Sequence, residues 1–261
     1  MASPKVGLSM LYLLAEPFSN MLEQLAKTDV TYIELVDDGL HTLNNQRVST
    51  LNNLAESYKL KFSVHAPFAD INIASPTKEI SRATVKRMEK SIRHARNLNA
   101  YLWVFHPGLQ TGTGIFYPGM DWRQNCKTAK LLFSIASDFG VKAAIENVPE
   151  PYPFLMKNAA DFTKFYEEVN GDIGIVLDVG HANINGQIEP FLETFARKIV
   201  HVHAADNDGK GDQHLGIGHG TIDWNRITDL MKKARYNKVV VVESVEHVRE
   251  SVQKLKQLFQ Q

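Results

Sequence analysis

The hydrophobic residues of this chain gather in eight short apolar runs, and a longer stretch with helical spacing follows each run. Runs of this length predict strands, and apolar positions that recur every three or four residues predict helices. The predicted strands are Lys5–Met10, Tyr32–Val36, Phe62–His65, Leu102–His106, Lys142–Glu146, Ile173–Asp178, Ile199–His203 and Val239–Glu243. The predicted helices are Phe18–Lys27, Leu43–Tyr58, Pro76–Leu98, Trp122–Phe139, Asn158–Val169, Ile188–Phe195, Asp223–Ala234 and Glu246–Phe259.

This order of elements predicts the fold class. Strict alternation of strand and helix is typical of a parallel sheet, and eight such units predict an α/β protein of the (β/α)₈ TIM-barrel type. The strands are apolar throughout, as expected where helices cover the sheet. An open, doubly wound sheet is the main alternative. No linker or change of composition divides the chain, so we expect one catalytic domain over residues 1–261.

Composition limits the partners and the cellular compartment expected for this protein. The 29 basic and 29 acidic side chains balance, so no overall field attracts nucleic acid, although a local basic patch remains open. The single cysteine, Cys126, excludes an internal disulfide and a thiolate zinc cluster. No apolar run is long enough to cross a membrane, and the N-terminal MASPKVGLSM lacks a signal-peptide pattern. We therefore expect a cytoplasmic protein with no membrane partner.

Metal-ligand chemistry is concentrated in the stretch IVHVHAADNDGKGDQHLGIGHG, which begins at Ile199. Alternation along the strand places His201 and His203 on one face. The loop that follows carries Asp212 and His214, and such oxygen and nitrogen donors suit Zn²⁺ or Mn²⁺. Taken alone, the stretch fits a structural histidine pair beside a polar loop equally well. His201 is expected to support the site through hydrogen bonds rather than to bind metal.

Residues of the same kind end the other strands. Parallel barrel strands all finish at one rim, where the active sites of this fold lie. One polar strand end says little, whereas six in succession are hard to explain by packing. The six are His65, His106, Glu146, Asp178, His203 and Glu243, and three loop residues, His181, Asp212 and His214, extend the set. The aromatic residues Phe68, Phe116 and Tyr117 follow rim strands and are candidates for a pocket wall.

The number of donors distinguishes two kinds of chemistry. Nine ligands are too many for one four-coordinate metal. Three divalent ions would outweigh the charge of the four carboxylates and attract an anion such as a phosphoester. A single metal on Glu146, Asp178, His203 and Glu243 would leave a negative site, which suits a neutral sugar and proton transfer by carboxylates.

Several segments resemble the xylose isomerase-like TIM-barrel superfamily, which includes endonuclease IV and many sugar isomerases and epimerases. The matching segments are SVHAPFADINIA, VFHPG, AIENVPEP, VLDVGHANING, HVHAADNDGKGDQHLGIGHG and VVVES. The resemblance to endonuclease IV implies three metals. It places the first on His65, His106 and Glu146, the second on Glu146, Asp178, His203 and Glu243, and the third on His181, Asp212 and His214. Simple sugar epimerases of the superfamily usually keep only the second set.

Two loops depart from the endonuclease IV pattern, in which polar and basic residues enter the DNA. The loops after the first two strands read Leu11–Glu16 and Asp37–His41. The Asp37 and Asp38 pair is expected to repel phosphates. The second strand, in YIELVDDGL, looks more like that of a sugar isomerase.

These observations give a first hypothesis and alternatives. The first is endonuclease IV-like, metal-dependent hydrolysis of a phosphoester, either abasic-site DNA or a small phosphorylated substrate, with up to three Zn²⁺ or with Mn²⁺. The alternative is a sugar or sugar-phosphate isomerase or epimerase, in which Glu146 and Glu243 form an acid/base pair beside one metal. A metal-binding barrel without activity is a third reading. The sequence leaves the substrate and the oligomeric state open.

Overall fold

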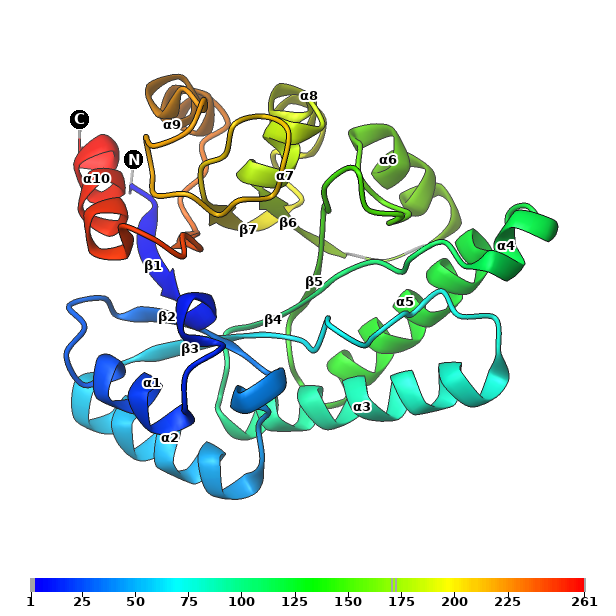
Figure 1. The fold of residues 1–261 in the computed structure, drawn as a ribbon, viewed down its shortest axis with the longest axis horizontal. Helices are drawn as coiled ribbons and strands as arrows, with labels where there is room; N and C mark the ends of the chain where they lie inside the picture. Colours follow the sequence, from blue (N-terminus) through cyan, green and yellow to red (C-terminus); the bar gives the residue numbers. More distant parts are fainter. Residues whose placement is uncertain (1–2, 170, 172, 261) are drawn as a thin grey trace.

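Eight parallel strands close into a barrel in the computed structural model, which describes residues 3–169, 171 and 173–260 (Figure 1). Each strand pairs with the next along the chain, and the last pairs with the first. The strands are β1 (Lys5–Ser9), β2 (Tyr32–Val36), β3 (Lys61–His65), β4 (Leu102–Phe105), β5 (Ala143–Glu146), β6 (Gly174–Asp178), β7 (Ile199–Ala204) and β8 (Val239–Val242). The predicted (β/α)₈ barrel is confirmed. Met1 and Ala2 of the N-terminal segment lie outside the described residues.

Helices surround this barrel (Figure 1). The predicted ones are α1 (Phe18–Leu25), α2 (Asn45–Tyr58), α3 (Lys78–Asn97), α5 (Met120–Asp138), α6 (Ala159–Glu168), α8 (Ile188–Phe195), α9 (Trp224–Lys233) and α10 (Val248–Gln260). Four short helices were not predicted, because three to six residues are too few to show a period: η1 (Met10–Leu13), η2 (Gly39–His41), α4 (Gly112–Phe116) and α7 (Val179–Ile184). All four follow a strand at the carboxyl end of the barrel. None of the described helices has the length and hydropathy to cross a bilayer.

The main apolar core lies between the strands and the helices around them. Trp103 and Phe105 of β4 are fully buried there, and the Trp103 indole donates a hydrogen bond to Ser91 Oγ of α3 at 3.1 Å. A second, smaller cluster of Leu102, Val104, Ala144 and Val176 belongs to the alternate positions of β4, β5 and β6. Those positions share the interior face of the barrel with His65 and His201, to which their strand register pairs them.

Asp206, two residues after β7, anchors the loop that carries Asp212 and His214. Its buried carboxylate accepts hydrogen bonds from the backbone N–H groups of Gly218 at 2.8 Å and Ile222 at 3.2 Å, and from Trp224 Nε1 at 2.9 Å. Removing it leaves several buried donors without an acceptor. We expect Asp206→Ala to lower the free energy of unfolding by about 3 kcal/mol, measured by urea denaturation at a fixed metal concentration.

Asp208 provides the matched control for that measurement. It lies in the same loop, is exposed, and accepts hydrogen bonds from the backbone of Lys210 and Gly211. Water can replace it as an acceptor, so Asp208→Ala should change stability little. Equal losses in the two variants would show that burial at Asp206 does not hold the loop.

Candidate metal and active site

The structure brings the nine predicted ligands together at the carboxyl-terminal rim of the barrel. Parallel register places Asp178 of β6 beside His203 of β7, while His106 and Glu243 directly follow β4 and β8. The potential ligand atoms form three sets, and within each set these atoms lie within 4.8 Å of one another. The sets are His65, His106 and Glu146; Glu146, Asp178, His203 and Glu243; and His181, Asp212 and His214. The grouping is that of the predicted three sites, and metal binding itself stays a prediction.

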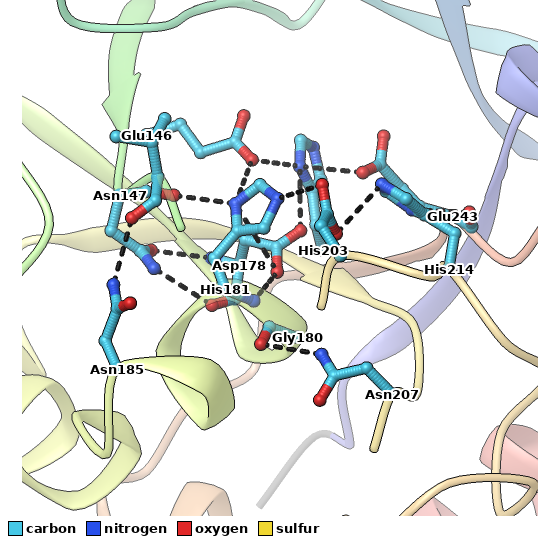
Figure 2. Close-up of polar contacts among 12 residues, drawn as sticks. Glu146, Asn147, Asp178, Gly180, His181, Asn185, His203, Asn207, His214 and Glu243 are labelled. Carbon is cyan, nitrogen blue, oxygen red and sulfur yellow. Dashed lines mark hydrogen bonds and ion pairs between the residues drawn. The ribbon is translucent and has the colours of Figure 1, made fainter. Parts of the chain in front are cut away.

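Glu146, the last residue of β5, belongs to two of these sets. Its Oε2 lies 3.4 Å from His65 Nε2 and 3.4 Å from His106 Nε2. Its Oε1 lies 3.2 Å from His203 Nδ1, and Glu243 Oε2 lies 3.4 Å from the same nitrogen. The carboxylates of Glu146 and Glu243 flank His203 in Figure 2. Glu146 would therefore contribute to holding a cation in each of two sets.

The third set lies on the loops beyond β6 and β7. Asp212 Oδ2 lies 3.3 Å from His181 Nε2, and Asp212 Oδ1 lies 3.3 Å from His214 Nε2. Asp178 ends β6 and also caps α7, because its Oδ1 accepts the backbone N–H of His181 at 2.7 Å. Because of this cap, α7 begins directly after β6, and its first turn places His181 at the rim beside Asp178.

Three of the five histidines in these sets have their second ring nitrogen in a hydrogen bond, and His203 has it in an ion-pair contact. His65 Nδ1 lies 2.9 Å from the carbonyl oxygen of Ala66, His181 Nδ1 lies 2.9 Å from that of Asn147, and His214 Nδ1 lies 3.0 Å from that of Glu243. His203 Nε2 lies 2.9 Å from the carboxylate of Glu34. Such contacts fix the ring and leave the remaining nitrogen available to a cation.

Burial and close charges shift the pKa values of these groups. Burial, with the nearby carboxylates, raises the pKa of Glu243 to about 7. Burial would also raise the pKa of Glu146, but the facing His203 and His106 lower it well below its usual range. Burial would lower the pKa of His181, yet Asp178 and Asp212 raise it to about 10. Several buried carboxylates lie close together here, and a bound cation would compensate their negative charge.

The donor atoms fit a divalent metal. Glu146 Oε2 and Asp178 Oδ2 are buried and accept no hydrogen bond from the residues that the structure describes. A buried carboxylate oxygen without a donor is costly unless a cation compensates it. Imidazole nitrogens with carboxylate oxygens, and no thiolate, match the preferences of Zn²⁺ and Mn²⁺.

A cavity of about 580 Å³ opens above the three sets. His65, Glu146 and Glu243 are among the polar residues on its floor. Hydrocarbon side chains form much of the remaining wall, among them Leu11, Leu14, Phe68 and Val245. The described residues that line it include no lysine or arginine. Phe68 takes the predicted place in the wall, whereas Phe116 and Tyr117 are largely exposed and do not line it.

Asp37 does not present the free charge on which the expected repulsion of phosphate by Asp37 and Asp38 was based. Asp37 is fully buried, and Arg87 forms an ion pair with its carboxylate at 2.9 Å. Asp38 accepts hydrogen bonds from the backbone N–H groups of Phe68 and Ala69, both at 2.9 Å. Arg87 therefore compensates the charge of Asp37, whereas Asp38 keeps its charge and holds the backbone at Phe68 and Ala69. The sequence alone did not indicate that Arg87, fifty residues away, pairs with Asp37.

Glu34 and Asn147 support the site and were not predicted. Glu34 contacts His201 and His203 inside the barrel, at 3.3 and 2.9 Å. Asn147 follows Glu146, and its side chain donates to the Asp178 carbonyl at 3.0 Å and accepts from the Asp178 N–H at 2.8 Å. A lone charge in the middle of the apolar strand YIELV was the available signal for Glu34. His201 lies against Glu34, which agrees with its expected supporting place.

Comparison with known proteins gives one family and several relatives. A family model described as "Xylose isomerase-like TIM barrel" matches residues 22–258. An uncharacterized protein of Methanocaldococcus jannaschii is 31% identical over 252 residues, which cover 95% of this chain and 86% of that protein. A probable endonuclease 4 of Halothermothrix orenii is 25% identical over 213 residues, 69% of each chain.

Among solved structures, the chain is similar to one described as a D-tagatose 3-epimerase-like protein. The two share 29% sequence identity and superpose with a TM-score of 0.92. The match covers 98% of this chain and 97% of the other. The two proteins therefore share the barrel fold over nearly their whole length.

Proposed function

Because the chain belongs to the xylose isomerase-like TIM barrel family, we propose that it is a divalent-metal-dependent epimerase or isomerase of an uncharged ketose. The observation that carries this proposal is the rim cavity, which presents the buried carboxylates of Glu146 and Glu243 but, among its described lining residues, no lysine or arginine. Such a cavity can move protons, and it has no cationic side chain to receive a phosphate. The D-tagatose 3-epimerase-like relative supports the same class of chemistry.

The positions of Glu146 and Glu243 support the proposed epimerisation. They come from β5 and β8, which are not neighbours in the barrel, and both contact His203. A substrate carbon held between them would have one carboxylate near each face, so one could remove a proton and the other return it from the opposite side. A metal held by Glu146, Asp178, His203 and Glu243 would, when bound, polarise the adjacent carbonyl and make that proton more acidic.

Phosphoester hydrolysis remains a second candidate because of a specific observation. The sets His65–His106–Glu146 and His181–Asp212–His214 go beyond what one metal needs. Three cations would supply the positive charge that the cavity wall lacks. The probable endonuclease 4 of Halothermothrix orenii supports this candidate at lower identity.

Proton exchange separates the two candidates. Metal-loaded protein should be incubated in D₂O with D-fructose, D-psicose, D-tagatose and L-ribulose, with ketose phosphates, and with an abasic-site duplex. Epimerisation by proton transfer should place deuterium on the reacting carbon of a free ketose, visible by NMR. Cleavage of the duplex or release of inorganic phosphate, with no exchange in any ketose, would overturn the epimerase proposal.

The metal content of the protein should also report on the third set. We expect three metals per chain in protein purified without a tag and one fewer in His214→Ala, because Asp212 and His181 alone are a poor site. Elemental analysis after gel filtration measures the ratio. Asp208→Ala is the matched control, since Asp208 is exposed on the same loop and belongs to none of the groups of described residues that could hold a cation. An unchanged count in His214→Ala would remove the third metal from the proposal.

A further inference from the structure

Glu34 is a carboxylate buried inside the barrel, below the rim. It sits in the middle of β2, paired in register with Ser9 of β1 and Ser63 of β3, and has no exposed surface. It does not line the rim cavity. A carboxylate is expensive to bury, so its place in an apolar strand needs a specific partner. That partner is the rim ligand His203.

We propose that Glu34 is a positioning residue that holds His203 with Nδ1 facing Glu146, Asp178 and Glu243. This inference rests on the proposed metal at those four residues and does not depend on which substrate the protein takes. Glu34 Oε1 lies 2.9 Å from His203 Nε2, on the side of the ring away from Glu146 and Glu243. A ring proton on Nε2, the nitrogen that faces Glu34, would leave the lone pair of Nδ1 directed at the cation.

The need for a side-chain oxygen of this reach follows from the position of His203 in the barrel. His65, His181 and His214 lie at the rim or in loops, where each reaches a free backbone carbonyl. His203 lies within β7, between β6 and β8, and parallel pairing occupies the backbone groups on both sides. Its ring points into the barrel, so only a side chain from another strand can take the Nε2 proton.

Other side chains fix Glu34 in turn. Ser63 Oγ donates a hydrogen bond to Glu34 Oε2 at 3.0 Å, and Tyr101 donates its hydroxyl proton to Ser63 Oγ at 3.2 Å. His201 Nε2 lies 3.3 Å from the same Glu34 oxygen. Ser63 and His201 both contact Oε2, whereas Oε1 faces His203 Nε2 and accepts no hydrogen bond from the described residues. The carboxylate is therefore oriented before any metal binds.

The length and the charge of Glu34 can be tested separately. Glu34→Gln keeps the reach of the side chain and an oxygen acceptor but loses the charge. Glu34→Asp keeps the charge but is one methylene too short to reach His203. If the role is positioning, Glu34→Asp should weaken metal binding about 10- to 100-fold, whereas Glu34→Gln should weaken it less than about threefold.

The measurement is chelator competition with Zn²⁺, together with the visible absorption of Co²⁺-loaded protein, so it needs no substrate. Circular dichroism and thermal unfolding confirm that each variant is folded. The reverse order of losses, or equal losses, in the two folded variants would overturn the positioning role. A failed ketose assay with the expected order of metal affinities would overturn the epimerase proposal alone.

His201 provides the control. Glu34, His201 and His203 have ligand atoms within 4.8 Å of one another, so the three could themselves hold a cation. If Glu34 only positions His203, His201→Asn should leave the number of bound metals unchanged. Loss of one metal in His201→Asn would show that the cluster is itself a metal site and would overturn the proposal.

Discussion

Glu146→Gln should abolish turnover and remove metal from two of the three sets. Glu146 is the only residue that belongs to two sets, with Oε2 facing His65 and His106 and Oε1 facing His203. An amide cannot give an anionic oxygen to each side, and it cannot act as a base toward a carbon acid. We expect kcat/KM on the best ketose to fall at least on the order of 10³-fold. Steady-state kinetics and elemental analysis on the same preparation measure both losses.

Two further substitutions make this result specific. Glu150→Gln is the matched control, because Glu150 lies four residues later and is exposed and ion-paired with Lys157. It should change neither quantity. Glu243→Gln should also stop turnover, yet it should spare the metals of the first and third sets, since Glu243 belongs only to the second. Retention of more than a tenth of the activity by Glu146→Gln would contradict the assigned role.

The fold could be predicted because each unit of the barrel is local in sequence. β2 and α8 have the predicted bounds, since the apolar run Tyr32–Val36 and the helically spaced segment Ile188–Phe195 are each followed by charged residues. Parallel strands share one carboxyl end, so a ligand type at the end of a strand can be assigned to the rim without knowing any distance. This is why His65, Asp178 and His203 could be grouped from the sequence.

Contacts between distant segments could not be predicted in this way. The ion pair of Asp37 with Arg87 and the contact of Glu34 with His203 each join two separate units of the barrel. A charge in an apolar strand signals that a partner exists but does not identify it. The short helices α4 and α7 were not predicted for a different reason. A helix of five or six residues is too short to show a periodic pattern of apolar positions.

The order of the two functional hypotheses changed for a physical reason. Counting ligands favoured a hydrolase, since nine donors suit three cations. The count carries no information about the wall of the cavity, where Leu11 and Leu14 from η1 and the loop after it face the metal sets. An apolar wall without lysine or arginine, among the described residues, is a poor phosphate site. The relative described as a D-tagatose 3-epimerase-like protein points the same way.

Asp212→Asn should distinguish phosphoester hydrolysis from ketose epimerisation more clearly than the other substitutions. Asp212 touches only His181 and His214 of the proposed ligands, with one oxygen toward each. If phosphate binds across three cations, loss of the third should cost several kcal/mol of transition-state stabilisation, or roughly a 10²- to 10³-fold fall in kcat/KM for a phosphoester. If the second set alone carries epimerisation, turnover of a free ketose should fall less than about tenfold. Both rates need measuring on one preparation.

We expect the second outcome for free ketoses, with one metal fewer per chain. The reasons are that Glu146 and Glu243 stay in place and that Asp212 lies outside this pair, which is proposed to move the proton. Asp208→Asn serves as the control, because Asp208 is exposed in the same loop and contacts only neighbouring backbone N–H groups. A fall of 10²-fold or more with a free ketose, absent from the Asp208 variant, would place the third metal in the reacting site. The proposed division of labour between the second and third sets would then be wrong.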